Sequence, residues 1–256
     1  MRRRGGRAVL ARGLWTAGEL AVTLGVVVLL FVVHQLWWTN RQARAGARHE
    51  VSVLERRWQD GAADPATPTP GATGSADSAQ GDDRGRGHDR DRSAGSGAGG
   101  RGPRRDQAYA VLRIPRIGLT VPIAEGIGRA AVLNKGYVGH YPRTAQPGQA
   151  GNVALAGHRN THGEPFRRLD EVRRGDTVRV DTADARYTYV IERTLPRTSP
   201  ADGTVIARVP YSSAHPRYRY TEPGYYLTLT TCTPEFTSRY RLVVWARLRA
   251  AAPRVP

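Results

Sequence analysis

The chain has 256 residues, of which 39% are apolar, 29 are Gly and 17 are Pro, so a single core spanning its whole length is excluded. Its one cysteine excludes an intramolecular disulfide and a cysteine-rich zinc or iron–sulfur site. The formal net charge is +17, but the surplus is spread along the chain. Because no basic helix or basic–aromatic platform collects it, we expect no nucleic-acid partner and favour attraction to an anionic envelope polymer.

An apolar segment near the N-terminus predicts a membrane-spanning helix. Residues 20–38 contain no Asp, Glu, Lys or Arg, and about 20 such residues cross a bilayer. Residues 1–13 carry five arginines, which favours a cytoplasmic tail, while Trp37 and Trp38 fit an interfacial aromatic belt. A cleaved signal peptide is the alternative, although no small-x-small site follows the segment. We therefore expect a single-pass anchor over 14–38 in the cell membrane, with the remainder extracellular.

Residues 39–106 are predicted to form a juxtamembrane segment and a disordered linker. Residues 39–58 are compatible with a short helix that continues from the anchor. From Asp60 to Asp106 the sequence has no Leu, Ile, Val, Phe, Tyr or Trp, so it has nothing to bury. We interpret this stretch as a flexible tether that holds a folded domain away from the membrane.

Residues 107–256 predict a mainly β domain. Residues 176–195 have the alternation of a β-hairpin, with a turn at 182–185. Two short segments, 128–135 and 164–172, favour helix. Many short strands with few helices are typical of a closed β-barrel, here of about eight strands. The other predicted strands are 109–117, 119–123, 152–158, 225–232 and 239–248.

Two side chains at predicted strand ends are candidates for nucleophilic catalysis. Cys232, the single cysteine, ends an apolar strand, and its thiolate would be the nucleophile. His158 ends another predicted strand 74 residues earlier and is the candidate general acid and base. His162 follows four residues later and competes with it by spacing alone. Only tertiary structure can bring the cysteine and a histidine together.

An arginine could stabilise a developing oxyanion beside the cysteine. Arg241 lies nine residues after Cys232, in a strand expected to return antiparallel to it. Arg239 falls on the same face by parity, so spacing leaves both arginines open. No acidic cluster has calcium spacing, and we expect no metal and no cofactor.

The long stretch from 197 to 224 and the residues before the cysteine are candidates for substrate binding. Loops of this length are usually functional, and this one holds the apolar residues Val205, Ile206 and Tyr211. Thr230 and Thr231 directly precede the cysteine. They could contact a substrate backbone, or they could simply be good strand formers.

These motifs resemble those of the sortases. The sequence TLTTC at 228–232 is similar to the Thr-Leu-x-Thr-Cys signature, and ALAGHR at 154–159 resembles the segment around the family's catalytic histidine. RLVVWA at 241–246 resembles the Arg-led last strand, which implies that Arg241 is the functional arginine. Residues 139–176 look particularly like class E sortases of high-GC Gram-positive bacteria.

The resemblance implies a sortase β-barrel and a cysteine transpeptidase. Cys232 would cleave a Leu-Pro/Ala-x-Thr-Gly-like sorting signal at the C-terminus of surface proteins, between Thr and Gly. A thioester would form, and an amine of a peptidoglycan precursor (lipid II) would resolve it. His158 would act as acid and base, and Arg241 would hold the oxyanion.

Two alternatives remain at this point. An L,D-transpeptidase-like peptidoglycan enzyme also uses Cys and His in a β-rich domain, but it would need a Ser-x-Gly-Cys type motif, and Thr231 directly precedes Cys232. A non-catalytic Arg-rich domain that binds wall polymers is the second alternative. In that case Cys232 would be an inert buried thiol.

Overall fold

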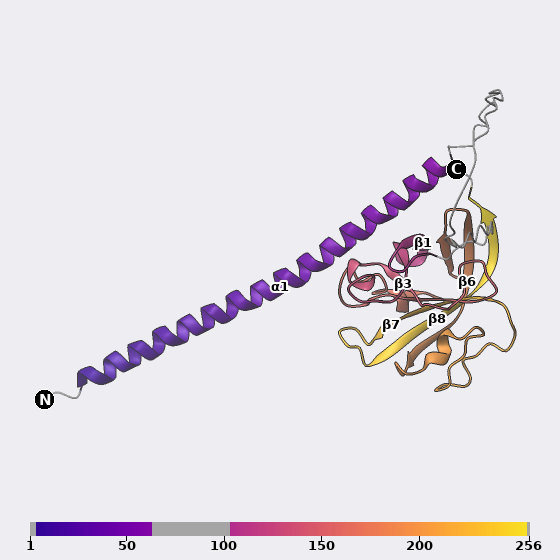
Figure 1. Cartoon of the computed structure of the whole chain (residues 1–256). Helices are drawn as coiled ribbons and strands as arrows, with labels where there is room; N and C mark the ends of the chain where they lie inside the picture. Colours follow the sequence, from indigo (N-terminus) through magenta and orange to yellow (C-terminus); the bar gives the residue numbers. More distant parts are fainter. Residues whose placement is uncertain (1–3, 63–102, 255–256) are drawn as a thin grey trace, which may run out of the picture.

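The computed structural model describes residues 4–62 and 103–254, which form one long helix and a β-barrel (Figure 1). The helix, α1, runs from Arg4 to Ala62. The disordered linker predicted for the second half of 39–106 falls mainly on residues 63–102, outside the described residues.

Eight strands close into a barrel, as the sequence predicted, in the order β1-β2-β3-β4-β7-β8-β6-β5. Two neighbouring pairs, β2–β3 and β4–β7, are parallel, and the other pairs are antiparallel. The barrel is therefore mixed. The strands are β1 (Ala108–Ile114), β2 (Leu119–Glu125), β3 (Val138–His140), β4 (Gly151–Ala156), β5 (Thr177–Asp181), β6 (Ala185–Thr198), β7 (Tyr225–Thr233) and β8 (Tyr240–Pro253).

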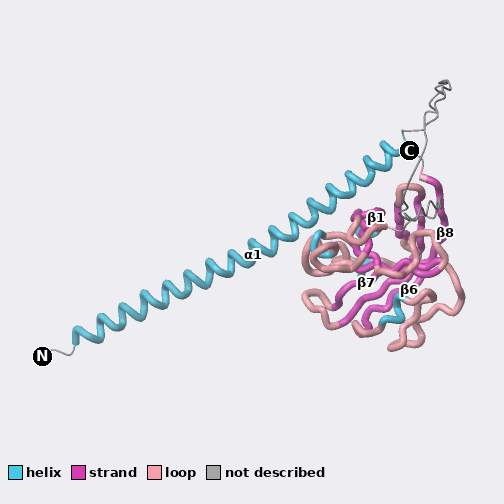
Figure 2. Tube along the Cα trace, viewed as in Figure 1, coloured by secondary structure: helices cyan, strands magenta, loops and turns pink. Residues whose placement is uncertain are grey.

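The predicted hairpin is present as β5 and β6, which pair antiparallel around a turn that Thr182 closes by hydrogen bonds with Ala185. The two segments that favoured helix form single 3-10 turns instead, η2 (Leu133–Lys135) and η3 (Leu169–Glu171). Two further 3-10 turns are η1 (Pro115–Ile117) and η4 (Gly203–Ile206). Figure 2 shows how little helix lies among the strands.

Aliphatic side chains fill the barrel, because alternate residues of each strand point inward. Each fully buried Leu, Ile or Val contributes about 1.5–3 kcal/mol. A second cluster lies on the outer side of β6, β7 and β8, where Trp245 and Tyr226 pack under the loop that holds Val205. Fully buried interior residues include Leu112, Ile123, Leu155, Ile191, Leu229 and Val244.

The helix α1 has two different parts. Within the described residues it is the one helix long and apolar enough to cross a membrane, and the side chains described over 15–38 are exposed. Its N-terminal part projects away from the barrel, whereas its C-terminal part lies beside it (Figure 1). There, one face is buried at intervals of three or four residues, through Ala43, Ala47, Val51 and Leu54.

The packing of α1 on the barrel was not predicted. The tether interpretation placed the domain away from the membrane, but the juxtamembrane residues themselves contact β1, β2 and η2. Glu55 pairs with Arg113 of β1, and the Arg254 guanidinium lies 4.4 Å from the centroid of the Trp58 ring. The end of the helix and the end of β8 therefore meet.

Candidate active site

His158 and Cys232 lie at matching positions on two neighbouring parallel segments, His158 just beyond β4 and Cys232 near the end of β7. β4 and β7 pair with Ala156 opposite Thr230, and each candidate follows its paired residue by two positions. The pairing extends past β4, since Gly157 N donates to Thr230 O at 3.2 Å. Neighbouring strands run about 4.8 Å apart. The register therefore brings the imidazole and the thiol, both half-buried, to the same end of the barrel.

Cys232 lies opposite Arg241 across the antiparallel β7–β8 pair. Opposed residues project from the same face of a sheet. Arg241 Nη1 donates to the carbonyls of Ser238 at 2.9 Å and Tyr240 at 3.0 Å, which holds the guanidinium near the start of β8. Arg239 precedes the strand and is exposed, 5.2 Å from the centroid of the Tyr240 ring. In the strand register, Arg241 and not Arg239 is therefore the residue paired with Cys232.

A hydrogen bond orients the His158 imidazole. The amide oxygen of Asn134, in η2, lies 3.0 Å from Nε2. Because that oxygen can only accept, Nε2 carries the proton and Nδ1 is the basic atom. Burial lowers the pKa of His158 to about 4, helped by the neighbouring His162 and Arg129. The imidazole is therefore neutral at neutral pH and able to accept a proton.

His162 lies beside His158, with ring centroids 5.4 Å apart and planes inclined at 30°. It belongs to the loop beyond β4 and has a φ of 52°. Its Nδ1 is buried and has no hydrogen-bond partner among the residues that the structure describes. Two adjacent imidazoles disfavour double protonation, so His162 helps to keep His158 neutral.

The two threonines before the nucleophile are buried and hydrogen-bonded to β4 and its extension. Thr231 Oγ1 donates to Gly157 O at 2.8 Å, and Thr230 Oγ1 donates to Leu155 O at 3.2 Å. The Tyr141 hydroxyl also lies 3.2 Å from Thr230 Oγ1. Both threonine hydroxyls therefore fix the strand that carries the nucleophile.

The loop between β6 and β7 holds the other predicted substrate-binding residues. Val205 is buried in the cluster around Trp245, whose Nε1 donates to Val205 O at 3.0 Å. Ile206 lines a pocket of about 240 Å³ near the start of β4. Tyr211 is exposed. Val205 and Ile206 thus lie near the start of β4, whereas Cys232 lies beyond its end.

A buried carboxylate organises the same loop. Asp202 accepts hydrogen bonds from the hydroxyls of Ser212 at 2.5 Å, Thr198 at 2.6 Å and Thr204 at 2.8 Å. Burial alone would raise the pKa of Asp202, but these hydrogen bonds outweigh it and lower the pKa to about 2. The charged carboxylate therefore ties both sides of the loop together.

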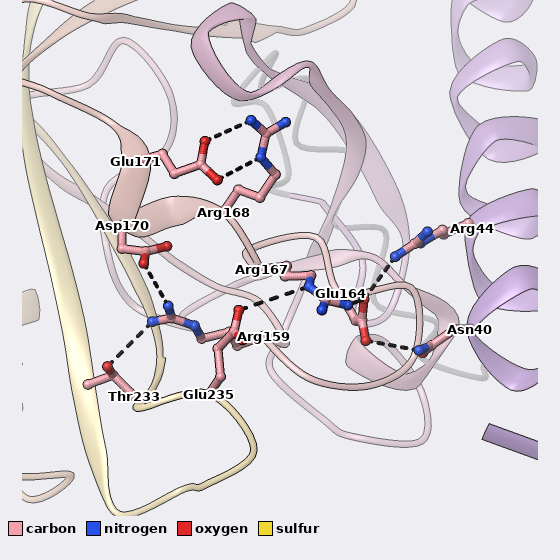
Figure 3. Close-up of polar contacts among 10 residues, drawn as sticks. All are labelled: Asn40, Arg44, Arg159, Glu164, Arg167, Arg168, Asp170, Glu171, Thr233 and Glu235. Carbon is pink, nitrogen blue, oxygen red and sulfur yellow. Dashed lines mark hydrogen bonds and ion pairs between the residues drawn. The ribbon is translucent and has the colours of Figure 1, made fainter. Parts of the chain in front are cut away.

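Polar contacts also join the loop after β4 to the end of β7 (Figure 3). Arg159 is buried, lies 3.0 Å from Asp170, and donates to Thr233 Oγ1 at 3.4 Å. Arg167 lies 3.9 Å from Glu235. Sequence analysis missed these contacts, although the position of an arginine directly after the candidate histidine was a signal that could have found one of them.

Residues 112–249 match the family model of the sortase domain. The chain belongs to the sortase family. It is 40% identical to Sortase SrtE1 of Streptomyces coelicolor over 257 residues, which cover 98% of this sortase and 61% of the relative. It is 32% identical to Sortase SrtE2 of the same organism, over 96% of this sortase and 86% of the relative. This sortase thus spans less than two thirds of the length of SrtE1.

Solved structures agree with this membership. The crystal structure of Sortase E1 from Streptomyces coelicolor with a tripeptide in the active site is 47% identical to this sortase. It has a TM-score of 0.55 and covers 58% of this chain and 92% of that chain. Sortase E from Streptomyces avermitilis is 43% identical, with a TM-score of 0.51, over 59% of this chain and 93% of that chain.

These findings confirm the predicted resemblance to class E sortases and to the sortase enzyme family. Membership of the sortase family decides against an L,D-transpeptidase-like enzyme, and thiol reactivity of Cys232 is the test that separates a catalyst from a wall-polymer binder. In this sortase the described residues hold no group of three or more His, Cys, Asp or Glu side chains placed to bind a metal ion.

Proposed function

We propose that this sortase is a membrane-anchored cysteine transpeptidase that cleaves a Leu-Pro/Ala-x-Thr-Gly-like sorting signal between Thr and Gly. The observation that carries the proposal is the strand register, which sets Cys232 opposite Arg241 on one side and level with His158 on the other. The identity to class E sortases supports the same substrate class.

In the first half-reaction the Cys232 sulfur attacks the carbonyl carbon of the signal's Thr, and the thiol proton passes to Nδ1 of His158. Arg241 stabilises the negative charge that develops on the carbonyl oxygen. The C–N bond to Gly then breaks, and His158 gives its proton to the departing amine. The products are a thioester on Cys232 and a released peptide that begins with Gly.

The second half-reaction reverses these roles. An amine of a peptidoglycan precursor such as lipid II attacks the thioester carbon and loses a proton to His158. The C–S bond breaks, and Cys232 recovers a proton from His158. A new amide then joins the surface protein to the precursor. The neutral resting state of His158 suits this cycle, because the imidazole must accept a proton in each half-reaction.

The sorting signal contacts the strand that carries the nucleophile and the loop before it. The hydroxyls of Thr230 and Thr231 are engaged by β4 and its extension, so these residues act by fixing the backbone beside Cys232. Val205 and Ile206 lie away from Cys232, near the start of β4, and act by shaping the loop, whereas the exposed Tyr211 is available to the peptide.

The proposed location is the cell membrane, with the N-terminus in the cytoplasm and the barrel outside. The apolar part of α1 and the five arginines before it support this orientation. Protease added to intact protoplasts should remove the barrel and leave the N-terminal tail. Protection of the barrel would refute the orientation.

The activity is tested by incubating the full-length protein in detergent with sorting-signal peptides that carry Pro or Ala at the second position. Mass spectrometry should find cleavage between Thr and Gly and, with an added amine, the transpeptidation product. Cys232→Ala should abolish both. Failure of the folded wild type to cleave any such peptide would overturn the proposed function.

A further inference from the structure

Residues 40–47 of α1 lie against the loop that follows His158. Asn40 Nδ2 donates to Glu164 Oε1 at 2.9 Å, and Asn40 Oδ1 accepts from Gly163 N at 3.2 Å. Arg44 Nη2 donates to Glu164 Oε2 at 2.8 Å, and its Nε donates to Gly163 O at 3.1 Å. Figure 3 shows Asn40 and Arg44 reaching from the helix to the Glu164 carboxylate.

Glu164 is a buried carboxylate that accepts hydrogen bonds on both oxygens. Its side chain is 4% exposed, and it also receives Arg167 Nη1 at 2.9 Å. A buried carboxylate that loses its partners is strongly destabilising. Glu164 itself has a φ of 52°, a conformation that non-glycine residues rarely adopt. The contacts from α1 therefore stabilise a strained conformation of this loop.

The helix also packs against the segment that carries Asn134. Gly136, which ends η2, has a φ of 80°, and a Cβ at this position would lie 2.9 Å from the carbonyl oxygen of Ala43. Only glycine allows this approach. The Oδ1 atom of Asn134, two residues earlier, is the hydrogen-bond partner of the His158 imidazole.

Both supports of His158 thus rest on the same stretch of helix. The Asn134 segment packs on Ala43, while Glu164 and Gly163 bind Asn40 and Arg44. A backbone hydrogen bond also closes this loop at His158, because Phe166 N donates to His158 O at 3.0 Å.

From these contacts we propose that Asn40, Ala43 and Arg44, in the juxtamembrane part of α1, position His158, so that this part of the helix supports the active site. Asn40, Arg44 and Glu164 are positioning residues, since they act through the loop and not on the substrate. The inference rests on the proposed function for its kinetic readout. It adds that full activity of the barrel requires the juxtamembrane part of α1.

The sharpest test is Asn40→Asp in the full-length protein. The change is nearly isosteric, but it sets a second carboxylate against Glu164, and like charges at this distance repel in a buried site. We expect kcat for sorting-peptide cleavage to fall roughly ten- to hundredfold, as for a slightly misplaced catalytic group, with little change in KM. Arg44→Ala should act in the same direction.

A reciprocal double variant provides the rescue. In Asn40→Asp/Glu164→Gln, the new amide can donate to the new carboxylate, and Arg44 can pair with that carboxylate one helical turn away. Much of the lost kcat should return. Arg41→Ala is the matched control, because Arg41 is exposed and its guanidinium lies 4.5 Å from the centroid of the Trp37 ring. This control should keep wild-type kcat.

A second readout needs no substrate. NMR titration of His158 in detergent micelles should show its pKa rising from about 4 toward the ordinary value near 6.5 when the loop is released by Asn40→Asp. Arg129 faces the imidazole in both proteins, whereas His162 belongs to the released loop and moves with it. Wild-type kcat and an unchanged titration in Asn40→Asp would overturn the inference. A wild type that cleaves no peptide would refute the proposed function, while the titration would still decide the role of the helix.

Discussion

Cys232 on β7 stands directly opposite Arg241 on β8 in an antiparallel pair. This pairing sets the two backbones opposite each other, and the carbonyls of Ser238 and Tyr240 hold the Arg241 guanidinium. A guanidinium held in this way fits the oxyanion-stabilising role proposed for Arg241, because a preorganised donor needs little rearrangement when charge develops.

The first prediction compares the two arginines near the start of β8. Arg241→Ala should lower kcat/KM by about 10²–10³-fold, the usual loss for one oxyanion donor. Arg241→Lys should restore little, since an ammonium lacks the planar fork of donors. Arg239→Ala should retain most activity, because that side chain is exposed. Equal losses for Arg239→Ala and Arg241→Ala in folded proteins would show that the functional arginine is misassigned.

The second prediction concerns the partner of the catalytic imidazole. Asn134→Ala removes the acceptor that fixes the tautomer of His158 and should lower kcat roughly tenfold or more. Asn134→Asp keeps an acceptor but adds a negative charge, which favours the imidazolium. The acidic limb of the pH–rate profile should therefore move to higher pH than in the wild type. Lys135→Ala, at an exposed neighbouring position, should leave the profile in place.

The third prediction is a pH dependence of stability from His158. Its pKa is about 4 in the folded protein and near 6.5 in an unfolded chain. Between these values the unfolded state binds more protons, so the free energy of unfolding should fall as pH decreases from about 6.5 to 4. Urea titrations should find this loss reduced in His158→Gln. An identical pH profile in wild type and variant would contradict the lowered pKa.

The fourth prediction concerns Asp202 and the loop before β7. The pKa of Asp202 is lowered to about 2, so its contribution to stability is complete above the ordinary carboxyl pKa near 4 and is lost as pH falls toward 2. Asp202→Asn should lower the free energy of unfolding by roughly 1.5–3 kcal/mol at pH 7, the scale of a hydrogen bond to a charge. The exposed Asp184→Asn is the control, measured by the same urea titrations. An equal loss of unfolding free energy in Asp184→Asn would show that the buried Asp202 carboxylate contributes no more than an exposed one.

The strands and the positions of Cys232 and His158 could be predicted because their signals are local. Alternating apolar residues mark a strand, and a polar side chain after the last of them marks its end. Parity alone leaves Arg239 and Arg241 open, whereas the family alignment and the register both favour Arg241.

The support of the histidine could not be predicted from sequence. Asn40 and Glu164 are 124 residues apart, and no local pattern marks one as the partner of the other. The low-complexity stretch after α1 also favoured a barrel that does not contact the helix, since two parts joined by a flexible linker often move independently. Only the three-dimensional structure shows that the C-terminal part of α1 packs against the barrel.

The parallel pairing of β4 with β7 has a consequence for folding. Ala156 and Thr230 are 74 residues apart, and contacts of such long range are costly in chain entropy and form slowly. Until these two strands join, the thiol and the imidazole belong to unrelated segments of the chain. A half-made polypeptide therefore has not yet brought the two side chains together. The candidate catalytic pair is assembled only when the barrel closes, so any activity that needs both side chains begins after folding.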